Sequence, residues 1–133
     1  MSLAKIRAAL ESRLNGMASA LPTAWENLAY TPTRGEPWQR VRLMLNEPID
    51  HTISSDVVEQ RGLLEVLLFY PQGDGPAAAQ AQAALVAARF APVQTLTASG
   101  TRVLLTQTPA IGTAWVDEAW YVLPVTVRWR SLP

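Results

Sequence analysis

Two segments of the chain have the hydrophobic periodicity of helices. In residues 3–17 apolar side chains recur every three or four residues, and charged side chains fall on the other faces. This spacing predicts an amphipathic helix with Ser2 as its N-cap. Residues 76–90 predict a second helix, because Pro76 suits its first position and Pro92 prevents its continuation. The face of this helix that we expect to lie close to a sheet consists of Ala77, Ala81, Ala84, Leu85 and Ala88.

The other apolar segments have the patterns of strands. Residues 38–45 alternate between apolar and polar positions, and residues 63–70 are almost uniformly apolar, as in a central strand covered on both faces. Further strands are expected over residues 25–30, 101–108, 113–116 and 119–130. This order of elements predicts the α+β class: a mixed, mostly antiparallel sheet of about four to six strands, with two helices packed on one face.

The shared periodicities predict a single core between one face of the sheet and both helices. Helical positions contribute at a period of 3.6 residues and strand positions at a period of two. The expected members are Leu3, Ile6, Leu10, Leu14, Val41, Leu43, Leu64, Val66, Leu68, Leu85, Phe90, Leu123, Val125 and Val127.

Composition and charge narrow the possible functions. A chain of 133 residues with 49% hydrophobic and 17% charged residues suits one globular domain over residues 1–133. Eleven basic and eleven acidic residues give a net charge of zero, which argues against a general nucleic-acid coat. The sequence contains no cysteine and one histidine, so we expect no disulfide, no metal site and no cofactor. Neither a secretion signal nor a membrane span is expected, which favours a soluble compartment and no membrane partner.

Candidate catalytic groups are few. His51 lies close in sequence to Asp50, Ser54, Ser55 and Asp56, which are the residue types of a hydrolytic triad. Residues so close together on one loop seldom form a triad, and the spacing of a calcium loop is absent. Gly73 and Gly75 precede a helix, but the lysine and hydroxyl of a phosphate-binding loop do not follow. The sequence therefore predicts that the protein is not an enzyme.

Two polar surfaces are better candidates for function. Alternation places Trp38, Arg40 and Arg42 on one face of a strand, and Trp120, Arg128 and Arg130 on one face of another. Tryptophan and arginine are enriched at the centres of protein interfaces, so these six residues are a candidate subunit or partner contact. A merely solvated face with extended arginines is an equal alternative.

The second candidate surface is acidic. Residues 46–60 contain Glu47, Asp50, Asp56 and Glu59 but neither lysine nor arginine. A connection this long between strands is commonly functional, and we expect it to be exposed and mobile. If the chain forms a ring, these carboxylates would either line its passage or pair with arginines of a neighbouring subunit.

Several of these segments resemble one protein family. The run from Arg61-Gly62 through Pro71-Gln-Gly73-Asp-Gly75, the alanine-rich helix that ends in Arg89-Phe90, and the late strand Val125-Thr-Val-Arg-Trp129 resemble the tail-terminator (tail-completion) proteins of long-tailed bacteriophages of the lambda type. The order and length of the elements also match. The resemblance implies a structural protein that forms a homo-oligomeric ring, usually a hexamer, on the finished tail tube.

In that family the ring stops polymerisation of the tube and joins the head. The implied partners are the tail-tube protein and a head-completion protein, while DNA passes through without specific binding. The implied location is the head–tail junction of the virion, after assembly in the cytoplasm of the bacterial host. The alternatives are another small head–tail connector, a monomeric binding module and, as the weakest, a small hydrolase that uses His51.

Overall fold

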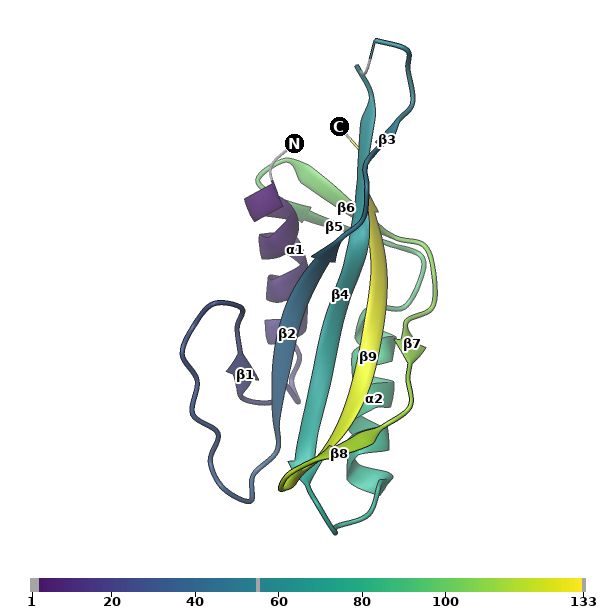
Figure 1. Cartoon of the computed structure of the whole chain (residues 1–133). Helices are drawn as coiled ribbons and strands as arrows, with labels where there is room; N and C mark the ends of the chain where they lie inside the picture. Colours follow the sequence, from purple (N-terminus) through teal and green to yellow (C-terminus); the bar gives the residue numbers. More distant parts are fainter. Residues whose placement is uncertain (1–2, 55, 133) are drawn as a thin grey trace.

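The chain folds as a long curled sheet with two helices (Figure 1). The computed structural model describes residues 3–54 and 56–132, so Ser2 and Ser55, named above as an N-cap and a triad candidate, lie outside the described residues. Within the described residues, α1 (Leu3–Asn15) and α2 (Ala77–Arg89) are the helices. The strands are β1 (Thr23–Ala24), β2 (Trp38–Leu45), β3 (Ile49–Asp50), β4 (Val58–Pro71), β5 (Gln94–Ala98), β6 (Thr101–Leu105), β7 (Ala110–Ile111), β8 (Trp115–Asp117) and β9 (Trp120–Ser131).

The sheet is larger than the sequence indicates. Its main path is β1-β2-β4-β9-β6-β5, while β3 pairs with β4, and β7 and β8 pair with β9. The α+β class stands, but the expected four to six strands are wrong, because nine strands pair in the described part of the chain. Among the strands that the sequence does not predict, β1, β3 and β7 have two residues each and no periodicity of their own; they form because β2, β4 and β9 offer hydrogen-bonding partners beside them. The five-residue β5, which pairs with β6, is also missed by the prediction.

Two long antiparallel strands form the centre of the sheet. β4 and β9 pair from Gln60 with Ser131 to Pro71 with Trp120, and β2 pairs with β4 from Trp38 with Phe69 to Leu45 with Gly62. Only the short β1 runs parallel to its neighbour among the paired strands. This continuous register fixes which side chains share each face of the sheet.

Both helices cover the same face of this sheet, and the main core lies beneath them (Figure 1). Twelve of the fourteen predicted core residues are buried, and the exceptions are Leu3 and Leu85, which are 45% and 49% exposed. α2 is rotated relative to the prediction. Because alanines occupy every side of α2, their periodicity does not select a face, and packing on the sheet buries Val86 while the larger Leu85 is exposed. The buried residues of α2 are Ala79, Gln82, Ala83 and Val86.

A second, smaller cluster lies on the opposite, helix-free face. It contains Ala24, Trp38, Phe69 and Val122, and the partly buried Tyr30 and Trp120 pack against it. The expected strand over residues 25–30 does not form; the strand there is Thr23–Ala24, and the chain after it folds over this cluster. The helix-free face is therefore covered at one end only.

Candidate interaction surface

The two predicted sets of tryptophan and arginine lie on one continuous surface. Trp38, Arg40 and Arg42 project from β2 on the helix-free face, and Trp120, Arg128 and Arg130 project from β9 on the same side, with β4 between them. Three cross-strand rows follow from the register: Arg40–Leu67–Pro124, Arg42–Glu65–Thr126 and Met44–Leu63–Arg128. We call this surface the open face.

Aromatic rings occupy one end of the open face. The Trp38 ring stacks on Phe69 at 4.0 Å and on Tyr30 at 5.3 Å, and Trp120 meets it edge-on at 5.9 Å. The Arg40 guanidinium lies 5.3 Å from the Trp38 ring centre and 5.5 Å from that of Phe69. Trp38 is only 4% exposed, so its ring lies beneath this surface and presents little area to another molecule.

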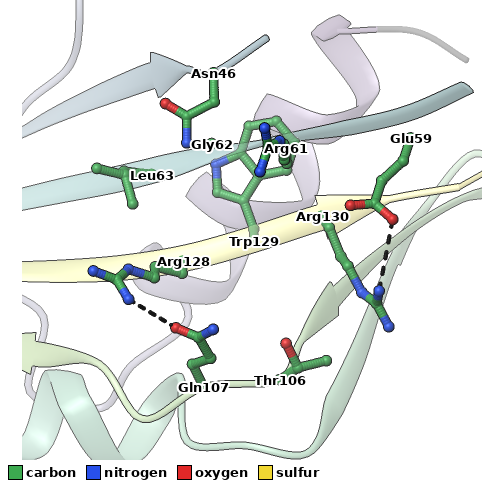
Figure 2. A pocket seen from close by; sticks show the side chains of 10 residues that line it. All are labelled: Asn46, Glu59, Arg61, Gly62, Leu63, Thr106, Gln107, Arg128, Trp129 and Arg130. Atoms are coloured by element: carbon green, nitrogen blue, oxygen red, sulfur yellow. Dashed lines mark hydrogen bonds and ion pairs between the residues drawn. The ribbon is translucent and has the colours of Figure 1, made fainter. Parts of the chain in front are cut away.

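Arginines gather at the other end of the open face, around a cavity of about 260 Å³ (Figure 2). Arg128 donates a hydrogen bond to Gln107 at 3.0 Å, and Arg130 forms an ion pair with Glu59 at 3.6 Å. Three arginines against one glutamate give the cavity wall a positive formal charge, which favours an anionic group. The lining residues are Asn46, Glu59, Arg61, Gly62, Leu63, Thr106, Gln107, Arg128, Trp129 and Arg130.

The acidic connection forms a β-hairpin arm that extends beyond the rest of the sheet (Figure 1). Ile49 pairs with Glu59, Asp50 pairs with Val58, and the His51 backbone N–H donates to the Val57 carbonyl at 2.8 Å. Glu47, Asp50 and Asp56 are exposed, as predicted. We call residues 46–54 and 56–57 the arm.

Glu59 does not belong to that exposed acidic surface. It lies in β4, is 6% exposed, and its carboxylate contacts His51 Nε2 at 3.2 Å as well as Arg130. The expectation that Glu59 shares the exposure of the other three carboxylates is therefore wrong. The physical reason is that β4 starts earlier than the apolar run predicts, so its pairing draws residue 59 into the sheet.

In the described part of the arm, no hydrogen bond joins His51 to Ser54. His51 contacts Glu59, whereas Ser54 Oγ donates to Asp56 Oδ2 at 2.6 Å and so is engaged away from the histidine. Among the described residues there is no group of three histidines, cysteines or acids placed to hold a metal ion. None of the described helices has the length and apolarity needed to span a membrane.

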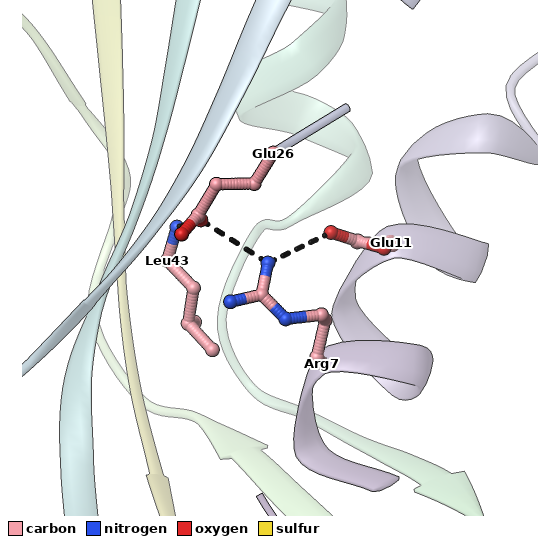
Figure 3. A network of polar contacts seen from close by, with 4 residues as sticks. All are labelled: Arg7, Glu11, Glu26 and Leu43. Atoms are coloured by element: carbon pink, nitrogen blue, oxygen red, sulfur yellow. Dashed lines mark hydrogen bonds and ion pairs between the residues drawn. The ribbon is translucent and has the colours of Figure 1, made fainter. Parts of the chain in front are cut away.

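A polar clamp protects the free edge of β2 (Figure 3). The Glu26 carboxylate accepts the Leu43 backbone N–H at 2.8 Å and pairs with Arg7 at 3.1 Å, and Arg7 also pairs with Glu11. The Leu43 hydrogen bond, followed by Arg7, lowers the pKa of Glu26. Upstream, the Gln39 N–H donates to the Pro22 carbonyl at 2.9 Å. The segment before β2 thus occupies edge positions at which another chain would otherwise pair.

The open face also contains residues of β4 that the pattern of one strand alone does not reveal. Leu63, Glu65 and Leu67 of β4 lie half-buried between the arginines of β2 and β9. Gly62 is required beneath them, because a Cβ there would lie 2.1 Å from the Met44 carbonyl oxygen and 2.9 Å from the Trp129 ring. The predicted inward side of β4, with Leu64, Val66 and Leu68, is confirmed, and the pairing register places the alternate residues on the open face.

Comparison with known proteins gives a consistent result. A family model described as "Phage tail terminator protein" matches residues 5–129. Five chains of solved structures also match. One of them is 28% identical in sequence to this chain and superposes with a TM-score of 0.81; the match covers 98% of this chain and 96% of that chain. A search of curated proteins found no match. The family match and the structural likeness both extend over nearly the whole chain.

Proposed function

Because the chain belongs to the phage tail terminator family, we propose that it assembles as a ring on the finished tail tube, stops tube polymerisation and presents the surface that joins the head. The observation that carries this proposal is the family match over residues 5–129. Members of this family are structural proteins of the phage tail.

The proposed assembly is a homo-hexamer at the head–tail junction, formed in the host cytoplasm. One surface of the ring binds the last ring of the tail-tube protein, the opposite surface binds a head-completion protein, and DNA passes through the centre without specific binding. The exposed arginines of the open face support this proposal, because arginine beside aromatic rings is typical of interface centres. We assign subunit or partner contacts to Arg40, Arg42, Trp120, Arg128 and Arg130.

The exposed carboxylates of the arm have two possible places in such a ring. Along the passage, Glu47, Asp50 and Asp56 from each copy would repel DNA phosphates within the ~8 Å screening length and keep the passage free of bound DNA. At a subunit contact, they would instead pair with arginines. Both places give the arm a role in assembly.

The proposal is tested by following tail assembly in the host. A phage that lacks this gene should make tubes of uncontrolled length that fail to join heads, and wild-type protein supplied in trans should restore both properties. Electron microscopy measures tube length, while native mass measurement of the purified protein counts the subunits. Normal, infectious particles without the gene would overturn the proposal.

A deletion within the chain tests the arm by the same assays of tail assembly. Deletion of residues 50–56 removes the end of the hairpin, whose described residues lie outside both hydrophobic clusters. Circular dichroism should show an intact fold, whereas tail completion or head joining should be impaired. Unchanged infectivity would show that the tip is a passive connection.

A further inference from the structure

We infer that the arm of one subunit docks on the open face of the next subunit, so that the ring closes through head-to-tail contacts. This inference rests on the ring proposed above and commits to a second copy of the chain as the occupant of the open face. It is carried by the opposite formal charges of the two surfaces and by the exposed or half-buried apolar side chains beside those charges.

The arm carries carboxylates without cationic partners. Glu47, Asp50 and Asp56 give it a formal charge of −3, and none of the three forms an ion pair with another described residue. At the tip, Ile53 is completely exposed, with a relative accessibility of 108%. A hairpin that projects from the body with acids and an exposed isoleucine suits a complementary surface on another molecule.

The open face has the opposite features. Its five arginines and two glutamates give a formal charge of +3, and among the described residues only Arg130 forms an ion pair. The half-buried Leu63 and Leu67 lie in the middle of the charged positions. The charged residues of this face are Arg40, Arg42, Glu59, Arg61, Glu65, Arg128 and Arg130.

The arm cannot reach the central arginines of its own subunit. β4 runs directly from the base of the arm across the open face, and its Glu65 lies opposite Arg42. The seven residue steps from Val58 to Glu65 span about 23 Å of extended strand, and the arm points away along the same line (Figure 1). The base of the arm does meet the near end of its own face, where Arg61 donates to the Glu47 carbonyl at 3.0 Å and His51 contacts Glu59 at 3.2 Å. The central Arg40 and Arg42, in contrast, are available only to the arm of a different molecule.

Such a contact joins two different patches, the arm of one copy and the face of the next. A contact of this kind is heterologous, and it closes into a ring when the rotation between successive copies is a whole fraction of a full turn. A self-complementary patch produces a dimer instead. Equal and opposite formal charges orient the approach and disfavour other partners. Because the charges are exposed, assembly should weaken as salt concentration rises.

Cross-linking tests the contact directly, because the chain has no cysteine of its own. In a protein with Ile53→Cys and Leu67→Cys, a short bismaleimide should produce a ladder of covalent oligomers that ends at the ring. The matched control pairs Ile53→Cys with Leu85→Cys, which is 49% exposed on the helix-covered side and should give no ladder. Proteins that carry only one of these cysteines measure how much cross-linking random collisions produce.

Neutralised variants then test the direction of the contact. A face variant (Arg42→Gln with Arg128→Gln) and an arm variant (Asp50→Asn with Asp56→Asn) should each raise the protein concentration needed for half assembly by about tenfold or more. Lys5→Gln, which changes an exposed charge on α1, should leave that concentration unchanged. Mixed in equal amounts, the two variants should form a heterodimer that grows no further, since only one arm and one face remain intact.

The outcomes separate this inference from the proposed function. A hexamer that gives no arm-to-face ladder, or whose arm cysteine reacts with the tube protein instead, overturns the inference and leaves the ring in place. A protein that gives neither oligomer nor ladder at its highest soluble concentration overturns both.

Discussion

The two faces of the central sheet meet different physical demands, although the same strands form both. Beneath the helices, Ile6, Leu10 and Val66 are completely buried in a continuous apolar core. On the open face, a small aromatic cluster occupies one end, and arginines with half-buried leucines occupy the rest. The covered face supplies most of the hydrophobic stabilisation, while the open face leaves its charged groups available to partners.

The largest expected effect belongs to the covered face. Leu10→Ala should lower the free energy of unfolding by about 2–5 kcal/mol, because it leaves a cavity under α1. Urea denaturation measures the change. Leu85→Ala on the exposed side of α2 is the control and should cost less than about 0.5 kcal/mol. Equal losses at the two positions would contradict the division between core and surface.

A second substitution tests whether the aromatic end of the open face contributes to folding. Trp38→Ala should cost about 3 kcal/mol, because a buried ring stacked on Phe69 at 4.0 Å is lost. Denaturation of the purified protein measures this loss. If Trp38→Ala instead weakened assembly without changing stability, Trp38 would belong to the partner surface.

The clamp on the edge of β2 should have a smaller effect that depends on pH. Glu26→Gln should cost about 1 kcal/mol at neutral pH, a modest value because the side chain is 39% exposed. The pKa of Glu26 is lowered in the folded state, so its stabilisation is complete above the ordinary value of 4.5 and is lost as the pH falls through the folded pKa. The difference between wild type and variant should therefore shrink in acid, as denaturation at neutral and acidic pH would show. A constant difference would contradict the role of the carboxylate charge.

The smallest effect on folding should come from the arginine end. Arg128→Glu should change the free energy of unfolding by less than about 0.5 kcal/mol, since Arg128 is exposed and its side chain donates one exposed hydrogen bond to Gln107 among the described residues. The same reversal should weaken assembly, as sedimentation would measure. Arg40→Glu should also weaken assembly but cost about 0.5–1 kcal/mol, because Arg40 packs over the Trp38 ring. Normal assembly by both variants would mean that the open face is merely solvated.

Local periodicity determined much of this protein from the sequence. The spacing of apolar residues located both helices and the strands around residues 38–45, 63–70 and 120–130, because each pattern depends only on nearby side chains. Alternation also assigned Arg40, Arg42, Arg128 and Arg130 to their face of each strand. Twelve core residues followed from the same periods.

Only the tertiary structure decided how much of each face is covered. Alternation placed Trp38 beside Arg40, but the distant Tyr30, Phe69 and Trp120 bury it. In the same way, Glu59 is buried because β4 extends into the arm and brings it to Arg130, and the inward side of α2 is set by the sheet beneath it. Burial depends on segments far apart in the chain, whereas periodicity records only which neighbouring side chains share a direction.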